Sequence, residues 1–97
     1  MIGVVFYRDG NWLHCGLTDG RRFIDSQPTI GVSMRDVPPG GDVYWLGEAE
    51  GAAAWHKAWS RIGERFELCS AFVCQCLGGR CILPSGLEDR LRGTWKR

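Results

Sequence analysis

The sequence predicts an α+β fold, in which a small antiparallel sheet, begun by an N-terminal meander, packs against a layer of helices. Two Asp-Gly dipeptides, at residues 9–10 and 19–20, stand between β-prone segments and are typical of tight hairpin turns. Apolar residues then recur at helical spacing between Glu50 and Ile62. A chain of 97 residues has room for one hydrophobic core, so we predict a single domain over residues 1–97.

The composition is that of a packed chain with almost balanced charge. Hydrophobic residues make up 44% of the sequence, which excludes disorder. The 12 Lys and Arg residues against 11 Asp and Glu give a net charge of +1, which argues against a nucleic-acid partner. No apolar run reaches the roughly 18 residues of a membrane span. The first residues lack the pattern of an export signal, so we expect a cytoplasmic location as synthesised. The chain has 5 cysteines, and a closed set of disulfides would leave one thiol over, so we expect a reducing compartment.

The two hairpins predict a histidine beside a carboxylate. If each Asp-Gly pair forms a two-residue loop, facing positions keep a constant sum. The first loop then places Val5 opposite His14, and Tyr7 opposite Trp12. The second places His14 opposite Asp25, with Cβ atoms about 4.5–5.5 Å apart. Such a pair is either an ordinary cross-strand ion pair or part of a reaction centre, and the spacing by itself does not distinguish the two.

Alternation along these three strands separates two faces of the sheet. One face is apolar and the other is aromatic with the polar pair embedded in it. The first face holds Val4, Phe6, Leu13, Cys15, Leu17 and Ile24, and the second holds Val5, Tyr7, Trp12, His14, Phe23 and Asp25.

The middle of the chain predicts one further strand. Between Ser26 and Pro39 the pattern is irregular, and residues 30–32 fit either a brief strand or a loop. The Pro-Pro-Gly-Gly run at residues 38–41 marks a break, after which residues 42–46 have the composition of a fourth strand.

Two helices are expected before the C-terminal region. The first spans Glu50–Ile62, with a stripe formed by Ala52, Trp55, Trp59 and Ile62, and Gly63 ends it. His56 lies beside that stripe and is expected at the surface. The second is a buried helix over residues 68–77, closed by two glycines. A capping box at residues 85–88 predicts a last short helix.

Cysteines gather in the second helix. Cys69 would open it, where the helix dipole and unpaired backbone N–H groups favour the thiolate. Cys74 and Cys76 lie deeper in the apolar run and are expected in the core. Together with Cys81 these residues could also bind zinc, but structural zinc ligands usually come in pairs two to four residues apart within tight loops.

Three stretches of the chain resemble the circularly permuted papain-like hydrolases, which include the permuted NlpC-type cell-wall peptidases and the lecithin retinol acyltransferase relatives. A strand of that family begins with His, a small or apolar residue and Gly, as in His14-Cys15-Gly16-Leu17. A polar residue follows on the next strand, shortly before a proline, as Asp25 does. The cysteine comes last, at the start of an apolar helix, as in Cys69-Ser70, after a glycine and an aromatic residue that correspond to Gly63 and Phe66.

This resemblance, which covers residues 12–87, implies a permuted papain-like fold and a cysteine peptidase or amidase. It implies that Cys69 attacks an acyl carbon, that His14 transfers the proton and that Asp25 orients the imidazole. Water then releases the acyl-enzyme, and no cofactor or metal takes part. Phe66 stands where relatives often carry a tyrosine. We expect the backbone N–H of Cys69 to be the oxyanion donor.

The implied substrate is an amide in a peptide, above all in a peptidoglycan peptide of bacteria, although relatives also act on lipid esters. Because no export signal is evident, we expect such an enzyme to reach a cell wall on lysis, through a dedicated secretion route, or within a phage virion. Two other classes stay open: a non-catalytic structural or interaction module of the same fold, and a small zinc-binding protein.

Overall fold

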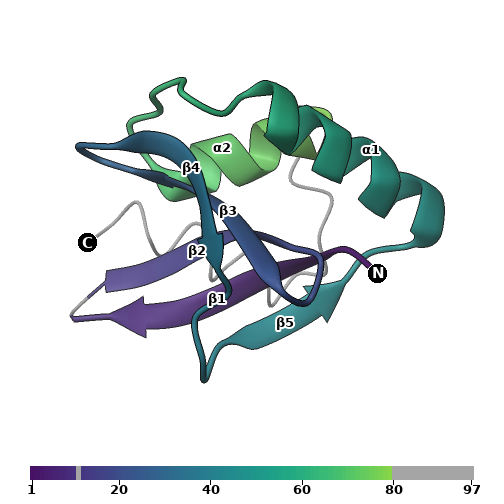
Figure 1. The fold of residues 1–97 in the computed structure, drawn as a ribbon, viewed down its shortest axis with the longest axis horizontal. Coiled ribbons are helices and arrows are strands. Elements are labelled where there is room, and N and C mark those ends of the chain that lie inside the picture. Colours follow the sequence, from purple (N-terminus) through teal and green to yellow (C-terminus); the bar gives the residue numbers. More distant parts are fainter. Residues whose placement is uncertain (11, 80–97) are drawn as a thin grey trace.

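A computed structural model describes residues 1–10 and 12–79 as a five-stranded antiparallel sheet with two helices. The strands follow one another in space as β4-β3-β2-β1-β5 (Figure 1). The α+β class and the N-terminal meander are therefore confirmed. The elements are β1 (Gly3–Asp9), β2 (Trp12–Thr18), β3 (Arg22–Gln27), β4 (Gly31–Asp36), β5 (Asp42–Trp45), α1 (Glu48–Ser60) and α2 (Cys69–Cys76).

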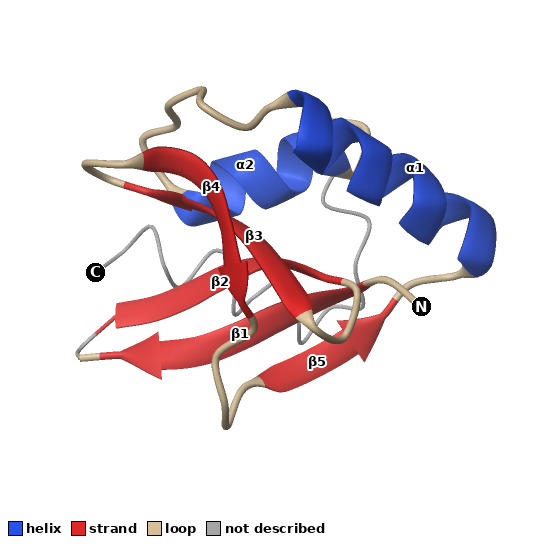
Figure 2. Cartoon of the chain, in the orientation of Figure 1, coloured by secondary structure: helices blue, strands red, loops and turns tan. Residues whose placement is uncertain are grey.

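Both helices lie on the same side of the sheet, and the hydrophobic core fills the space between them and the strands (Figure 2). The apolar face predicted from strand alternation is the face that the helices cover. Its buried members are Val4, Phe6, Cys15, Leu17 and Ile24, joined by Val32, Leu46, Ala54, Ala58, Phe72, Val73, Cys76 and Leu77. None of the described helices is long and apolar enough to cross a lipid bilayer.

The register of the first hairpin differs from the predicted one by two residues. Tyr7, not Val5, pairs with His14, and Asp9 pairs with Trp12. A type I′ turn centred on residues 9–10 would require a positive φ at Asp9. Among the described residues only glycines have positive φ, and Gly10 has a φ of 65°. The aspartate therefore stays in the strand, and the turn begins at the glycine.

The second hairpin is shifted in the same way. Thr18 pairs with Phe23 and Leu17 with Ile24, so four residues, 19–22, lie between the last paired residues of the two strands. Here the side chain of Asp19 accepts hydrogen bonds from the backbone N–H groups of Arg21 and Arg22, at 3.0 and 2.8 Å. These bonds replace the two-residue turn with a wider one built around the aspartate. A shift of two keeps every side chain on its predicted face, because the side-chain period of a strand is two.

The segment between β3 and α1 is more regular than its sequence suggests. Of residues 30–32, the last two begin β4, which continues to Asp36, and Ile30 lies in the turn before it. The predicted break at residues 38–41 is present, with a φ of 77° at Gly40. The strand that follows, β5, pairs with β1 at the far edge of the sheet.

Helix α1 buries a different face from the predicted one. Its buried residues are Gly51, Ala54 and Ala58, whereas Trp59 remains 42% exposed. Small side chains allow the helix to approach the sheet closely, and a Cβ on Gly51 would already lie 3.0 Å from Ile2. The large aromatic residues flank this contact, where Trp55 and Trp59 both lie under the guanidinium of Arg22.

Helix α1 begins and ends two residues before the predicted span of 50–62, and Gly63 lies in the turn that follows it, whereas α2 ends just before its predicted glycines. Gly63 has a φ of 94°, and Gly78 and Gly79 have φ values of 85° and 81° after the end of α2. Cys69 opens α2 as expected, and His56 is exposed on α1. The predicted capping box at residues 85–88 lies outside the described residues.

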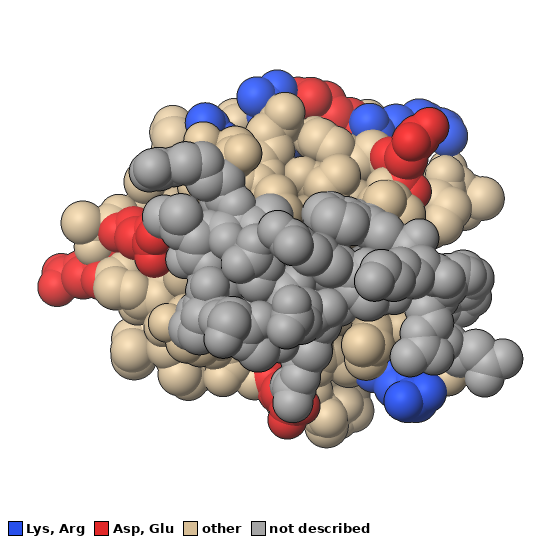
Figure 3. Space-filling model, turned by 180° about the vertical axis from the view of Figure 1, so that it is seen from behind, with Lys and Arg blue, Asp and Glu red and all other residues tan. Residues whose placement is uncertain are grey.

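On the face seen in Figure 3, the described Lys, Arg, Asp and Glu side chains form small separate groups of both signs.

Gly16 on β2 lies under the aromatic ring of Phe23. A Cβ at this position would be 2.6 Å from the Phe23 ring and 2.7 Å from the backbone oxygen of Ile24. We expect Gly16→Ala to reduce the free energy of unfolding by about 1–3 kcal/mol, as overpacking of a core does. Denaturant unfolding measures the change, and Gly47→Ala, whose Cβ would meet no atom within 4 Å, is the matched control. Equal effects of the two substitutions would contradict the packing argument.

Candidate functional site

The meander brings His14 of β2 and Asp25 of β3 into direct contact. Nε2 of His14 and Oδ2 of Asp25 are 2.5 Å apart, although the two residues do not face each other in the ladder. The His14 side chain is 13% exposed, whereas that of Asp25 is completely buried. The imidazole is therefore fixed from inside the protein by a carboxylate that water does not reach.

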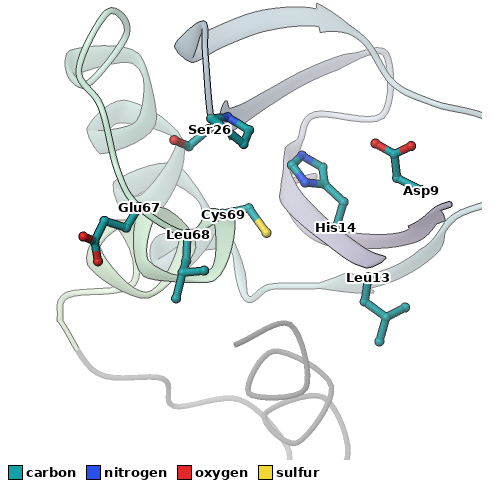
Figure 4. A pocket seen from close by; sticks show the side chains of 8 residues that line it. Asp9, Leu13, His14, Ser26, Glu67, Leu68 and Cys69 are labelled. Atoms are coloured by element: carbon teal, nitrogen blue, oxygen red, sulfur yellow. The ribbon is translucent and has the colours of Figure 1, made fainter. Parts of the chain in front are cut away.

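Cys69 occupies the first position of α2, and its sulfur points toward His14 (Figure 4). The backbone pairing of β2 with β3 covers only residues 17–18 and 23–24. The edge of β2 before these residues is therefore open to α2, and the backbone N–H of Cys15 donates to the Cys69 sulfur. The Cys15 thiol also donates to that sulfur, at a distance of 3.6 Å between the two Sγ atoms. Because Asp25 occupies Nε2 of His14, Nδ1 is the nitrogen left for the sulfur.

These contacts strongly favour the thiolate of Cys69. The hydrogen bond from the Cys15 thiol is the largest influence, burial opposes it, and His14 adds a hydrogen bond and a positive charge. Together they lower the pKa of Cys69 to about 4. The sequence predicted a lowered pKa of Cys69 from the helix terminus alone, whereas the structure adds three donors, which are the thiol and backbone N–H of Cys15 and the imidazole of His14.

The imidazole of His14 is held in its charged form. Burial alone would lower the pKa of His14, but hydrogen bonds with Asp25 and Cys69 outweigh it and raise the pKa to about 9. Between these two pKa values the pair exists as thiolate and imidazolium.

Arg35 and Tyr7 complete the surroundings of Asp25, and neither had been singled out as a partner of the carboxylate. Nη2 of Arg35 donates to Oδ2 of Asp25 at 2.9 Å and to the hydroxyl of Tyr7 at 2.6 Å. The ring of Tyr7 also packs edge-on against the imidazole of His14, with 5.3 Å between ring centroids. Arg35 comes from β4, so only a firm assignment of that strand could have placed its side chain near Asp25.

A pocket of about 400 Å³ opens beside the sulfur (Figure 4). Its walls are both apolar and acidic, and the nucleophile and the imidazole lie between two carboxylates, Asp9 and Glu67. The residues that line it are Asp9, Leu13, His14, Ser26, Pro28, Glu67, Leu68 and Cys69. A small molecule or a short chain segment can therefore reach Cys69 from solvent.

The two other cysteines of α2, Cys74 and Cys76, do not line this pocket. Cys76 is buried, and burial raises its pKa to about 12, as expected of a core thiol. Cys74 was also expected as a core thiol, but it is half-buried and disulfide-bonded. Within residues 1–10 and 12–79, no three His, Cys, Asp or Glu side chains are grouped in a way that could hold a metal ion. Cys81, the fourth sulfur of the zinc alternative, lies outside the described residues.

The three residues singled out from the sequence, His14, Asp25 and Cys69, thus lie together in the fold. Comparison of the chain with family models, with curated proteins and with solved structures finds no match in any of the three.

Proposed function

We propose that the protein is a cysteine hydrolase, a peptidase or amidase, with Cys69 as nucleophile, His14 as acid and base and Asp25 as the residue that orients the imidazole. One observation carries the proposal. A cysteine sulfur at a helix start lines a pocket beside an imidazole whose far nitrogen is 2.5 Å from a buried carboxylate. Nucleophile, base and orienting group in this order are the arrangement that activates a thiol for acyl transfer.

In the proposed reaction the Cys69 thiolate attacks the carbonyl carbon of an amide and forms a tetrahedral intermediate. The His14 imidazolium then protonates the leaving amine, and an acyl-enzyme remains on the sulfur. Neutral His14 next removes a proton from water, which attacks the acyl carbon and restores the thiolate and imidazolium. Asp25 keeps the imidazole in one orientation through both steps and stabilises its positive charge.

The N-terminus of α2 supports stabilisation of the intermediate. Cys69 is the first helical residue, and no side chain caps this end of the helix. The backbone N–H of Cys69 is therefore suited to donate to the oxyanion as negative charge develops on it. Removal of one such donor typically costs about 10²–10³ in turnover.

The order of these groups along the chain supports a permuted papain-like fold. His14 lies on β2, Asp25 on β3, and Cys69 follows on the last described helix. This order, together with the His-Cys-Gly and Cys-Ser stretches, is that of the permuted hydrolases that the sequence resembles.

The pocket favours a short peptide as substrate over a lipid ester. Two carboxylates, those of Asp9 and Glu67, lie on its walls on either side of the reactive pair. Their negative charge attracts a substrate with a positive group near the scissile bond, such as the free amine of a peptide. Peptidoglycan peptides carry such amines, and we propose them as the substrate class, with delivery on lysis or from a phage virion.

The pH dependence of alkylation tests the thiolate–imidazolium pair. The thiolate forms as the pH rises through about 4, and the imidazolium loses its proton as the pH rises through about 9. At about pH 5.5 an ordinary thiol is ionised to about one part in 10³, whereas Cys69 is mostly thiolate. A thiolate of low pKa is a weaker nucleophile, which reduces the gain in rate by a factor of about 10². Iodoacetamide should therefore modify Cys69 about tenfold faster than it modifies the thiol of glutathione.

His14→Ala is the decisive variant in this measurement, because it removes the imidazole and leaves Cys15 and the helix terminus in place. We expect the acidic limb of the alkylation profile to move toward the range of an ordinary thiol. Uniform labelling of several thiols, with no effect of His14→Ala, would identify a non-catalytic module instead. About one equivalent of zinc in the purified protein, together with unfolding by a chelator, would identify the zinc-binding alternative.

A further inference from the structure

Cys15 is a buried thiol that the proposed reaction does not consume. It is 0% exposed and lies on β2, 54 residues before Cys69 in the sequence, yet the two Sγ atoms are 3.6 Å apart. A disulfide has an S–S length of about 2.05 Å, so a movement of about 1.5 Å would join the two sulfurs. Cys76, the other free cysteine among the described residues, is buried in the core and does not line the pocket.

The two sulfurs differ in the way that a reactive and a resolving cysteine differ. Cys69 lines the pocket and is held as a thiolate, the form that reacts with peroxide. Cys15 is sealed from solvent, and burial raises its pKa well above the ordinary value, so it persists as a thiol. An oxidant entering through the pocket therefore meets Cys69 first, and the oxidised sulfur then has a thiol as its immediate neighbour.

We propose that Cys15 is the resolving cysteine of a reversible redox modification, in which peroxide oxidises Cys69 and a Cys15–Cys69 disulfide then forms. In the first step the Cys69 thiolate attacks one peroxide oxygen, the O–O bond breaks, and sulfenic acid and hydroxide result. In the second step the sulfur of Cys15 attacks the sulfenic sulfur. The S–O bond breaks, and its hydroxyl leaves as water with the Cys15 proton. Overall, one thiolate and one thiol are oxidised to the disulfide, and one peroxide is reduced to one hydroxide and one water.

The disulfide has two consequences. It removes the thiolate, so, insofar as the proposed function holds, it switches the hydrolase off until a thiol reductant restores both cysteines. It also protects Cys69 from further oxidation to sulfinic acid, which ordinary reductants do not reverse.

The test uses hydrogen peroxide on the whole protein and reads the bonds by mass spectrometry. Trypsin leaves Cys69, Cys74 and Cys76 on one peptide, because no Lys or Arg lies between Arg65 and Arg80. Fragmentation of the linked peptides must therefore assign the bond. In the wild-type chain we expect a Cys15–Cys69 linkage, loss of iodoacetamide labelling at Cys69, and recovery of that labelling after dithiothreitol.

Cys15→Ser is the informative variant, because the hydroxyl can still donate a hydrogen bond to Cys69 but cannot form a disulfide. In this variant we expect a sulfenic acid that dimedone traps, followed by sulfinic acid and loss of recovery by dithiothreitol. Cys76→Ser, which changes a second buried thiol, should behave like the wild type. Sulfinic acid at Cys69 of the wild type without any linkage to Cys15 would overturn the proposal.

These readouts do not depend on hydrolysis. A linkage in a protein that cleaves no substrate would leave the redox modification in place and reject the proposed function. Turnover of substrate in a protein that forms no linkage would leave the proposed function in place and reject the redox modification. Should Cys15→Ser fail to fold, the presence or absence of the linkage in the wild-type chain still decides the question.

Discussion

Replacement of Cys69 by serine is expected to lower kcat/KM by about 10³-fold or more, because a hydroxyl beside His14 does not ionise as the thiol does. His14→Ala should cause a loss of similar size, because it removes the group that protonates the leaving amine. Combining the two substitutions should add little to either one, because the residues act as a unit. The measurement is hydrolysis of a short peptide with a free amine, compared with its acetylated form.

Cys76→Ser is the matched control for this experiment. It changes a thiol on the same helix that is buried and does not line the pocket. We expect its kcat/KM to stay close to the wild-type value in folded protein, while the acetylated peptide is cleaved more slowly than the free amine. A Cys69→Ser protein that retains wild-type turnover would refute the mechanism.

Asp25→Asn is expected to lower kcat by about 10²–10⁴-fold while the protein stays folded. The amide keeps the shape of the carboxylate, but it brings no charge and can present an N–H to Nε2, which favours the wrong imidazole tautomer. The hydrogen bond with Asp25 is what raises the pKa of His14 most. Its loss should therefore move the alkaline limb of the rate profile from about pH 9 toward the ordinary range of histidine.

The pH profile separates an orienting role of Asp25 from a purely structural one. A structural role would reduce the amount of folded protein without moving the alkaline limb. Asp36→Asn, at the exposed end of β4, is the control, and it should leave both kcat and the limb unchanged. An Asp25→Asn profile with its alkaline limb still at about 9 would contradict the role assigned to the carboxylate.

Much of the site could be predicted because its members belong to strong local patterns. The Asp-Gly dipeptides indicated two hairpins, and strand alternation placed His14 and Asp25 on one face. The predicted registers of both hairpins were wrong, yet the predicted contact between the side chains of His14 and Asp25 is present. A slip of two residues keeps both side chains on the same face of the sheet, where they are long enough to meet. The helix that begins at Cys69 could also be predicted, from its apolar run and from the glycines that end it.

The parts that sequence patterns missed depend on distant segments. The predicted buried face of α1 was wrong because helical spacing was followed through the tryptophans, whereas Gly51, Ala54 and Ala58 are the residues that the helix buries. Arg35 could not be assigned to Asp25, because its strand sits in a segment with an irregular pattern. Cys15 was assigned to the apolar face, and its meeting with Cys69 depends on the place where β2 and β3 cease to pair.

The sequence by itself determined the hairpins, the two faces of the meander and the helix start that carries Cys69, because each depends on interactions among neighbouring residues. Only the tertiary structure decided which groups surround the Cys69 sulfur and which groups hold Asp25. Those neighbours come from β1, β2, β3, β4 and α2, so their distances depend on how these separate elements pack against one another. Packing of that kind is a property of the whole core, and no local pattern encodes it.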